Sequence, residues 1–296
     1  MTDPLCIYHG NCADGFTSAW VVRKFFDGAV DFHAGVYQDP PPDVAGRDVI
    51  LVDFSYKRPV LDEMAAKAAT IVILDHHKSA AEDLRGFPPP MDGPYDPLAM
   101  RDWQRECNAP SAVHALFDMG RSGAGIAWDY FFRGQSRPRL VNHVEDRDLW
   151  QFILPGTREI QACVFSYEYT FENWDRLADR CERAALDLVN EGRAIERKHF
   201  KDINEWIGVA GRRMTIAGHD VPVLNSTIFH TSDAGNIMAK GEPFAACYWD
   251  TKDGRVFSLR SQDDGLDVSE IAKQFGGGGH ARAAGFRVAL GWEGDP

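Results

Sequence analysis

The chain has 296 residues, of which 44% are hydrophobic and 26% charged, and it carries a formal net charge of −12. This length suits two domains, and this composition excludes an intrinsically disordered chain. No apolar stretch approaches the ~20 residues that span a bilayer, and the N-terminus lacks a basic signal-peptide head, so we expect a cytoplasmic protein with no membrane partner. The negative charge disfavours tight binding to long duplex DNA, because like charges repel.

The cysteines are scattered along the chain without any Cys-x-x-Cys pair. They are Cys6, Cys12, Cys107, Cys163, Cys181 and Cys247. This spacing argues against a disulfide framework and against a structural zinc site.

The first predicted element is a short strand at residues 5–9, followed by a glycine-containing turn and a helix from about residue 16 to residue 26. Such a unit collects polar side chains at the strand end and free backbone N–H groups at the helix N-terminus. The candidate ligands in this turn are His9, Asn11, Cys12 and Asp14. Taken alone, His9 also fits a hydrogen-bonded turn residue and Asp14 a simple helix cap.

The next elements repeat the pattern of a strand that ends in a polar side chain. Residues 31–37 predict a second strand, and residues 47–52 predict a buried strand that leads to Asp53. Residues 59–69 have helical spacing and lead to the following strand. Strands separated by helices or loops of this length predict a parallel, doubly wound α/β sheet.

An aliphatic and β-branched run at residues 70–74 ends abruptly in Asp75, His76 and His77. A run without polar alternation is typical of a strand that is covered on both faces. Ligands in open α/β sheets bind at the carboxyl ends of strands. A carboxylate beside two imidazoles suits Mn²⁺, Fe²⁺ or Zn²⁺ better than Mg²⁺ or Ca²⁺.

The middle of the chain is more irregular. Residues 88–108 are rich in proline, glycine and polar side chains and predict a surface excursion near the site. Residues 111–117 fit another strand, and residues 122–125 open a helix that runs to residue 132.

A further helix is predicted at residues 138–145, and it delivers Asp146 and Asp148. These carboxylates flank Arg147, so they fit a solvated turn held by salt bridges. Alternatively, one of them is the last metal ligand. Residues 175–206 carry apolar side chains at three- and four-residue spacing, which predicts an amphipathic helix that connects two domains.

The composition changes after residue 208, where short strands predict a compact α+β domain. These strands are expected at residues 214–216, 221–224, 245–249 and 256–259, with a helix at 268–275. We therefore expect three parts: a catalytic domain at residues 1–190, a helical connector at 191–207 and a substrate-binding domain at 208–296.

A glycine run in this last part predicts a phosphate-binding loop. Four consecutive glycines let a backbone approach a ligand closely and point its N–H groups at an anion. An arginine can add a bidentate contact to the phosphate. The candidate substrate-binding residues are Arg260, Ser261, Gly277, Gly278, Gly279, His280 and Arg282. A flexible hinge is the alternative, although a hinge does not require His and Arg directly after it.

These motifs together resemble the DHH family of phosphoesterases with its C-terminal DHH-associated domain. Asp75-His76-His77 is similar to the signature triplet, and the glycine run with residues 258–261 is similar to the substrate-binding motif. The remaining matches are His9 and Asp14 for the first motif, Asp53 for the second, and Asp148 or Asp146 for the fourth. In size and layout the chain resembles the nanoRNase and oligoribonuclease branch. It departs from the family where Cys12 replaces an expected aspartate, which alters one metal site and leaves Asn11 and Cys12 as uncertain ligands.

The resemblance implies an active site in the interdomain cleft, with two Mn²⁺ ions bridged by Asp53 and a water. One ion would be held by His9 and Asp53, and the other by Asp14, Asp53, His76 and Asp148. Asp75 would act as a ligand or support the bridge, and His77 would orient a ligand or protonate the leaving group.

The expected function is hydrolysis of short oligonucleotides or dinucleotides to mononucleotides by a protein that is a monomer or a homodimer. One alternative is a phosphatase for 3′-phosphoadenosine 5′-phosphate or a phosphodiesterase for cyclic dinucleotides. Another is a noncatalytic nucleotide sensor.

Overall fold

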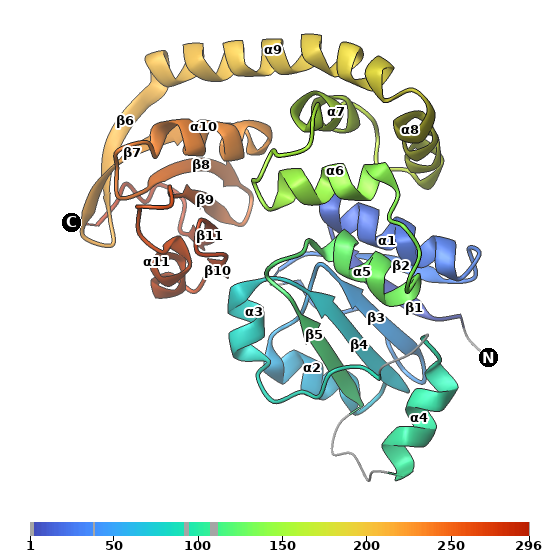
Figure 1. The fold of residues 1–296 in the computed structure, drawn as a ribbon. Helices are drawn as coiled ribbons and strands as arrows, with labels where there is room; N and C mark the ends of the chain where they lie inside the picture. The colour runs from blue at the N-terminus through green and yellow to red at the C-terminus, as the bar shows by residue number, and fades with distance from the viewer. Residues whose placement is uncertain (1–2, 38, 92–94, 107–111, 296) are drawn as a thin grey trace. The chain divides into compact units, whose positions relative to one another are not determined.

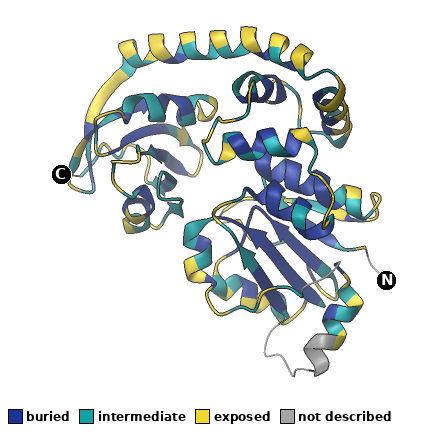
Figure 2. Ribbon diagram, in the orientation of Figure 1, coloured by how far each residue is buried: buried dark blue, intermediate teal, exposed yellow. Residues whose placement is uncertain are grey.

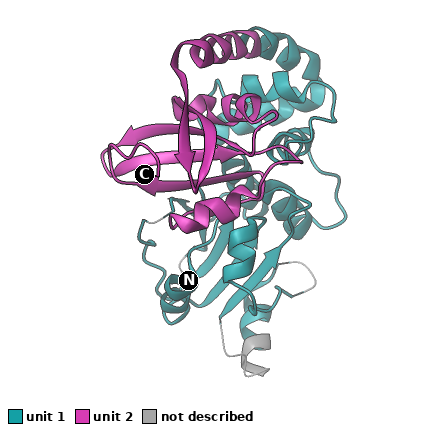
Figure 3. Ribbon diagram, turned by 90° about the vertical axis from the view of Figure 1, so that its left-hand side faces the viewer, with its two compact units in different colours: residues 1–195 teal, residues 196–296 magenta. Residues whose placement is uncertain are grey.

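The computed structural model describes residues 3–37, 39–91, 95–106 and 112–295. The chain forms two compact units, residues 1–195 and residues 196–296 (Figure 3). Helix α9 (Ala185–Ala210) crosses the boundary between them and includes the whole of the predicted connector at 191–207. Within the described ranges, no helix has the length and apolar character needed to cross a membrane.

Unit 1 is built on a parallel five-stranded sheet in the order β2-β1-β3-β4-β5 (Figure 1). Its strands are β1 (Leu5–His9), β2 (Asp31–Gly35), β3 (Asp48–Val52), β4 (Thr70–Asp75) and β5 (Val113–Phe117). The chain leaves β1 for β2 on one side and returns to β3 on the other, so the strand order reverses between β1 and β3. Such a reversal creates a crevice at the carboxyl ends of the two strands, where open α/β sheets bind ligands.

Alternating strand residues supply two hydrophobic cores, one on each face of this sheet. In β3, Ile50 and Val52 belong to one core and Val49 and Leu51 to the other, and all four are fully buried (Figure 2). This two-sided burial explains why the strands are uninterrupted aliphatic runs rather than alternating ones. The predicted doubly wound α/β fold is confirmed.

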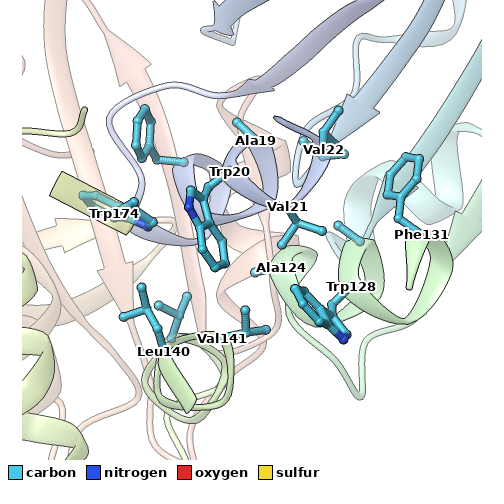
Figure 4. Close-up of a cluster of buried hydrophobic side chains, with 14 of the residues drawn as sticks. Ala19, Trp20, Val21, Val22, Ala124, Trp128, Phe131, Leu140, Val141 and Trp174 are labelled. Carbon is cyan, nitrogen blue, oxygen red and sulfur yellow. The ribbon is translucent and has the colours of Figure 1, made fainter. Parts of the chain in front are cut away.

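Helices pack on both faces of the sheet and on one another. They are α1 (Ala13–Phe25), α2 (Arg58–Ala65), α3 (Lys78–Asp83), α4 (Pro97–Glu106), α5 (Gly123–Phe131), α6 (Arg139–Asp148), α7 (Thr157–Val164) and α8 (Phe171–Arg183). Helices α1 and α5 contact the strands, whereas α6, α7 and α8 pack against other helices. Figure 4 shows how Trp20 of α1, Ala124 of α5, Leu140 of α6 and Trp174 of α8 pack in the larger core. Leu61 of α2 lies in the core on the other face.

Several predictions for this unit are wrong. Residues 88–108, predicted as an irregular excursion near the site, include α4. Arg101 of α4 donates to Asp48 at the amino end of β3, away from the carboxyl ends that form the site. The single helix predicted at 175–206 is instead α8 and α9, interrupted at Ala184, where φ is −146° and ψ is 44°. Helix α7 has no counterpart in the prediction, and Cys107 and Ser111 lie outside the described residues.

Unit 2 contains a mixed sheet in the order β10-β11-β9-β8-β7-β6, in which β7 and β8 are parallel and the other neighbours antiparallel. Its strands are β6 (Gly211–Ile216), β7 (His219–Asn225), β8 (Ala245–Thr251), β9 (Gly254–Arg260), β10 (Gly278–Gly279) and β11 (Ala283–Val288). Its helical elements besides α9 are the short 3₁₀ helix η1 (Ile228–His230), α10 (Thr231–Met238) and α11 (Val268–Gln274).

Two cores hold this sheet together. Ala234 of α10 packs with Leu224 and Cys247 in one core, and Ile271 of α11 packs with Phe257 in the other. The α+β character is confirmed, although the sequence did not predict α10, β10 or β11.

Candidate metal centre

Asp53 lies directly after β3 in a backbone conformation that non-glycine residues rarely adopt. Its φ is 53°, while its backbone N–H still donates to the Leu74 carbonyl of β4 at 2.9 Å. Such a left-handed position costs conformational energy and is common at functional sites. The strand therefore ends in a fixed turn at the crevice beside β1.

The Asp53 carboxylate contacts two imidazoles from different strands. Its Oδ1 lies 3.0 Å from His76 Nε2, and its Oδ2 lies 3.3 Å from His9 Nδ1. Burial opposes ionisation of this carboxyl, which is 1% exposed, but the neighbouring imidazoles outweigh burial and hold its pKa well below the usual range. Asp53 is therefore an anion in the folded protein.

Asp14 is held by the start of another helix. It lies in the first turn of α1, and its carboxylate accepts hydrogen bonds from the backbone N–H groups of Gly123 at 2.6 Å and Ala124 at 3.0 Å, at the N-terminus of α5. A Cβ atom at Gly123 would lie 2.4 Å from the Asp53 Cβ, so glycine is required for this close approach. Sequence reasoning missed Gly123 and Ala124 as site residues: residues 122–125 indicated a helix start, but their partner is 109 residues away.

Three carboxylates converge on the ring of His76. Its Nε2 lies 3.0 Å from Asp53, 3.5 Å from Asp148 and 3.8 Å from Asp14. Burial disfavours the charged imidazole, but the Asp148 and Asp53 carboxylates raise the pKa of His76 well above its usual value. Burial also raises the pKa of Asp14, and the charges of Asp53 and Asp148 add to the rise.

The structure places the two candidate carboxylates of α6 differently. Asp148, the last residue of the helix, reaches the cluster at His76. Asp146 accepts hydrogen bonds from the backbone of Ile153 at 2.8 Å and of Leu154 at 3.1 Å, and from the Thr157 hydroxyl at 2.5 Å. Both residues lie within α6 rather than after it, which corrects the predicted helix end at residue 145.

Asp75 binds its own neighbours. Its Oδ1 accepts hydrogen bonds from the backbone N–H of His76 at 2.7 Å and lies 2.7 Å from His77 Nδ1. This second contact fixes the ring of His77, as carboxylates commonly do for metal-binding histidines.

Asn11 and Cys12 lie in the turn between β1 and α1. Asn11 is exposed with a φ of 56°, a conformation that asparagine tolerates. Cys12 is the N-cap residue of α1, but its side chain makes no capping hydrogen bond. Burial raises the pKa of its thiol, and the carboxylates of Asp53, Asp148 and Asp14 raise it further.

Within unit 1, two groups of three side chains could each hold a cation, because their ligand atoms lie within 4.8 Å of one another. The groups are His9, Asp53 and His77, and Asp14, Asp53 and His76. They share Asp53; among the described residues, Asp75, Cys12 and Asp148 belong to neither group, although Asp148 Oδ2 lies 3.5 Å from His76 Nε2.

Unpaired buried atoms support the same interpretation. Asp75 Oδ2 is buried without a hydrogen-bond partner, and Asp53 Oδ2 and His9 Nδ1 face each other at 3.3 Å as a buried ion pair without a hydrogen bond. Burying an unpaired carboxylate oxygen is costly unless a cation compensates it. Carboxylate and imidazole donors around a shared aspartate fit a pair of divalent cations.

The predicted substrate-binding residues of unit 2 meet at one end of the β9–β11 pair. Arg260 on β9 pairs with Ala283 on β11, and its guanidinium donates to the Ser232 hydroxyl at 2.8 Å. The backbone N–H of Ser261 donates to the Arg282 carbonyl at 3.2 Å, and His280 lies in the connection between β10 and β11.

Arg282 and the glycine run help to hold the loops and strands of unit 2 together. The Arg282 guanidinium donates to the carbonyl of Gly265 at 2.7 Å and to that of Asp263 at 2.6 Å, so it anchors that loop. A Cβ at Gly277 would lie 2.0 Å from the Gly285 carbonyl oxygen, and one at Gly279 would lie 2.6 Å from the Ala283 carbonyl oxygen. Gly278 pairs with Gly285 in the β10–β11 ladder. Backbone packing alone therefore explains glycine at two of these positions.

Comparison with known proteins extends these findings. Residues 232–293 match the DHHA1 domain family. The chain is 30% identical over 306 residues to the uncharacterized protein R106 of Acanthamoeba polyphaga mimivirus, an alignment that covers 95% of this chain and 66% of that protein. It is 34% identical over 252 residues to oligoribonuclease NrnB of Bacillus subtilis strain 168, with 77% of this chain and 55% of that protein covered.

The fold is similar to the solved DHH domain of a member of the s1p family of ribosomal proteins, with a TM-score of 0.58 and 11% identity over 97% of this chain and 83% of that one. The chain belongs to the DHH phosphoesterase family and carries its DHHA1 domain. It spans less than two thirds of the length of both curated relatives.

Proposed function

We propose that this protein hydrolyses the phosphodiester bonds of short oligonucleotides or dinucleotides with the help of two divalent cations, Mn²⁺ in the first instance. The observation that carries this proposal is the shared position of Asp53 between two groups of ligand atoms. The name of the relative NrnB, an oligoribonuclease, supports the substrate class. The net charge of −12 favours short substrates over long polyanions.

Each side chain of the centre has a role that follows from its contacts. Asp53 would contact both cations, His9 and His77 would hold one, and Asp14, His76 and Asp148 would hold the other. When bound, such paired cations lower the pKa of a shared water and stabilise the charge that develops on the phosphoryl group. Asp75 keeps the His77 ring in place, and the N–H groups of α5 keep the Asp14 carboxylate in place.

Unit 2 would bind the substrate's terminal phosphate. Arg260, Ser261 and His280 lie together at one end of β9 and β11 and carry a guanidinium, a hydroxyl and an imidazole. The Arg260 guanidinium also donates to the hydroxyls of Ser232 and Ser258 and to the Leu259 carbonyl, which fix its position. Arg282 would act as a positioning residue, because its guanidinium already binds the carbonyls of the 263–265 loop. In this proposal, unit 1 is the metal-binding domain and unit 2 is the substrate-binding domain.

Turnover of a substrate panel tests the proposal. The panel contains RNA dinucleotides, pentanucleotides and 24-mers, 3′-phosphoadenosine 5′-phosphate and a cyclic dinucleotide, each with Mn²⁺ and with excess chelator. We expect the di- and pentanucleotides to be turned over fastest, with activity lost in chelator and lost by orders of magnitude in Asp75→Asn.

Other results would support other functions. Turnover of 3′-phosphoadenosine 5′-phosphate or the cyclic dinucleotide alone would contradict the oligonucleotide proposal and identify a small-nucleotide hydrolase. Nucleotide binding without any turnover would identify a sensor. Full activity in the presence of chelator would exclude metal-dependent chemistry.

A further inference from the structure

Unit 1 carries stacked arginine and aromatic side chains that the proposed hydrolysis does not use. This aromatic–arginine cluster consists of Arg147, Trp150, Phe152, Arg158 and Phe165. The Arg147 guanidinium carbon lies 4.5 Å from the Trp150 ring centroid and 5.5 Å from that of Phe165. The Arg158 carbon lies 3.7 Å from the Phe152 centroid, and the Trp150 and Phe152 rings meet edge to face at 5.0 Å.

The cluster adjoins the metal centre. Arg147 directly precedes Asp148, whose Oδ2 lies 3.5 Å from His76 Nε2. Trp150 follows two residues later, and its backbone N–H donates to the Arg147 carbonyl at 3.1 Å. The cluster therefore begins at the residue before a candidate ligand and continues from that ligand along the chain.

The backbone under the cluster is strained and firmly held. Trp150 has a φ of 57° and Phe152 a φ of 52°, which are unfavourable for large side chains. The backbone carbonyl of Asp146 accepts hydrogen bonds from Gln151 at 2.9 Å and from Phe152 at 3.2 Å, and its carboxylate binds the following residues. If the two rings only covered the end of α6 from solvent, Trp150 and Phe152 would not need an unfavourable positive φ. Their strained, fixed placement therefore favours a role in binding.

The rings are also accessible. Trp150 and Phe152 are only partly buried, and Phe165 is 46% exposed. Every nucleobase offers a π face that stacks on aromatic rings and on arginine guanidinium groups. The positive charges of Arg147 and Arg158 also suit a ligand that carries phosphate.

We propose that the aromatic–arginine cluster binds a nucleobase of the substrate, with Trp150 as the main stacking residue. The cluster then makes the enzyme prefer nucleotides over phosphodiesters that lack bases. This inference rests on the proposed function and adds a specificity determinant to it.

Two substrates that differ only in their bases test the inference: an RNA dinucleotide and the corresponding diribose phosphodiester without bases. Because base stacking is worth about 1–3 kcal/mol, Trp150→Ala should raise KM for the dinucleotide about tenfold. We expect kcat to stay within about twofold, since the reacting atoms are untouched. KM for the base-free substrate should not change, and Trp150→Phe, which keeps a ring, should lie close to wild type.

Phe87→Ala is the matched control, because Arg58 stacks on Phe87 at 3.9 Å in the same unit, and Phe87 packs against the core on the opposite face of the sheet. It removes a similar pair and should leave both KM values unchanged. An unchanged KM in Trp150→Ala, or an equal rise for both substrates, would overturn the inference.

Binding measurements separate this inference from the proposed function. By calorimetry, the wild-type protein should bind AMP about tenfold more tightly than ribose 5-phosphate, and Trp150→Ala should remove this difference. That result would support the stacking site even if no substrate were hydrolysed. Equal affinities in the wild type would refute the stacking site while leaving hydrolysis intact.

Discussion

At the scale of single residues, the metal centre depends on a few buried carboxylates whose partners come from distant parts of the sequence. Asp53 contacts His9 and His76, and Asp14 is held by the N-terminus of α5. The sequence predicted the ligands at the strand ends because polar side chains there are conspicuous after apolar runs. It could not show which of Asp146 and Asp148 reaches the cluster, since that depends on the direction in which α6 ends.

Substitution of these two aspartates should separate their roles. Asp146→Asn disrupts the hydrogen bonds to Ile153, Leu154 and Thr157, so we expect a loss of about 1–3 kcal/mol in the free energy of unfolding. Asp148→Asn removes a carboxylate beside His76 and should weaken Mn²⁺ binding, while it lowers the metal-free stability less than Asp146→Asn does. Urea denaturation and metal titration of both variants check this, and a reversed pattern would assign the ligand to Asp146.

The buried charges also predict how pH affects the metal-free protein. His76 has a raised pKa in the folded state, because the Asp148 and Asp53 carboxylates outweigh burial, so its stabilising contribution is complete below about pH 6.5 and is lost as the pH rises through the raised value. Burial raises the pKa of Asp14 in the folded state, so Asp14 also makes the folded protein more stable at lower pH. Asp53 has a lowered pKa, so its contribution to the free energy of unfolding is the same at every pH above about 4. It therefore does not change how stability depends on pH in the neutral range.

We therefore expect the melting temperature of chelator-treated protein to fall between pH 6 and pH 9. The decline should be shallower in Asp148→Asn, which lacks a carboxylate that favours the charged imidazole. Calorimetry across this range measures both, and a melting temperature that rises with pH would contradict the assigned protonation states. Mn²⁺ should bind more tightly as the pH rises, because protons compete for the same ligands.

At the scale of elements, the strands of unit 1 were predictable and several helices were not. Strands β1, β3 and β4 are short apolar runs with sharp polar ends, so their sequence alone sets their limits. Helices α7 and α10 are short, and their stability depends on tertiary packing more than on local pattern. The break at Ala184 also escaped prediction, because the apolar spacing continues across it.

The β10–β11 hairpin allows a direct test of why glycine is required. A Cβ at Gly277 would lie 2.0 Å from the Gly285 carbonyl oxygen, so Gly277→Ala must push the two segments apart. Overpacking of this kind costs about 1–3 kcal/mol, and we expect unit 2 to unfold at a correspondingly lower temperature. Gly208→Ala is the control, because nothing lies within 4 Å of that position in α9, and it should be neutral or slightly stabilising. Equal stability of Gly277→Ala and wild type would show that the hairpin can relax.

At the scale of the whole molecule, the motifs and the fold identify the family more firmly than they identify the substrate. The parallel sheet brings the ends of β1, β3 and β4 together, and the chain belongs to the DHH phosphoesterases. The sequence predicted the family and the parallel sheet because the motifs of unit 1 lie at the ends of short apolar runs that are recognisable as strands. The contacts of Arg282 and of the glycine run were not predictable, since they depend on how neighbouring loops and strands of unit 2 pack.

The number of Mn²⁺ ions bound per chain tests the central claim most directly. Calorimetric titration of chelator-treated, dialysed protein should give two ions for the wild type and for Asp62→Asn, a control at an exposed carboxylate of α2. Asp53→Asn should bind at most one ion, because both groups of ligand atoms include Asp53. Two ions in folded Asp53→Asn, or none in the wild type, would contradict a centre built around this shared carboxylate.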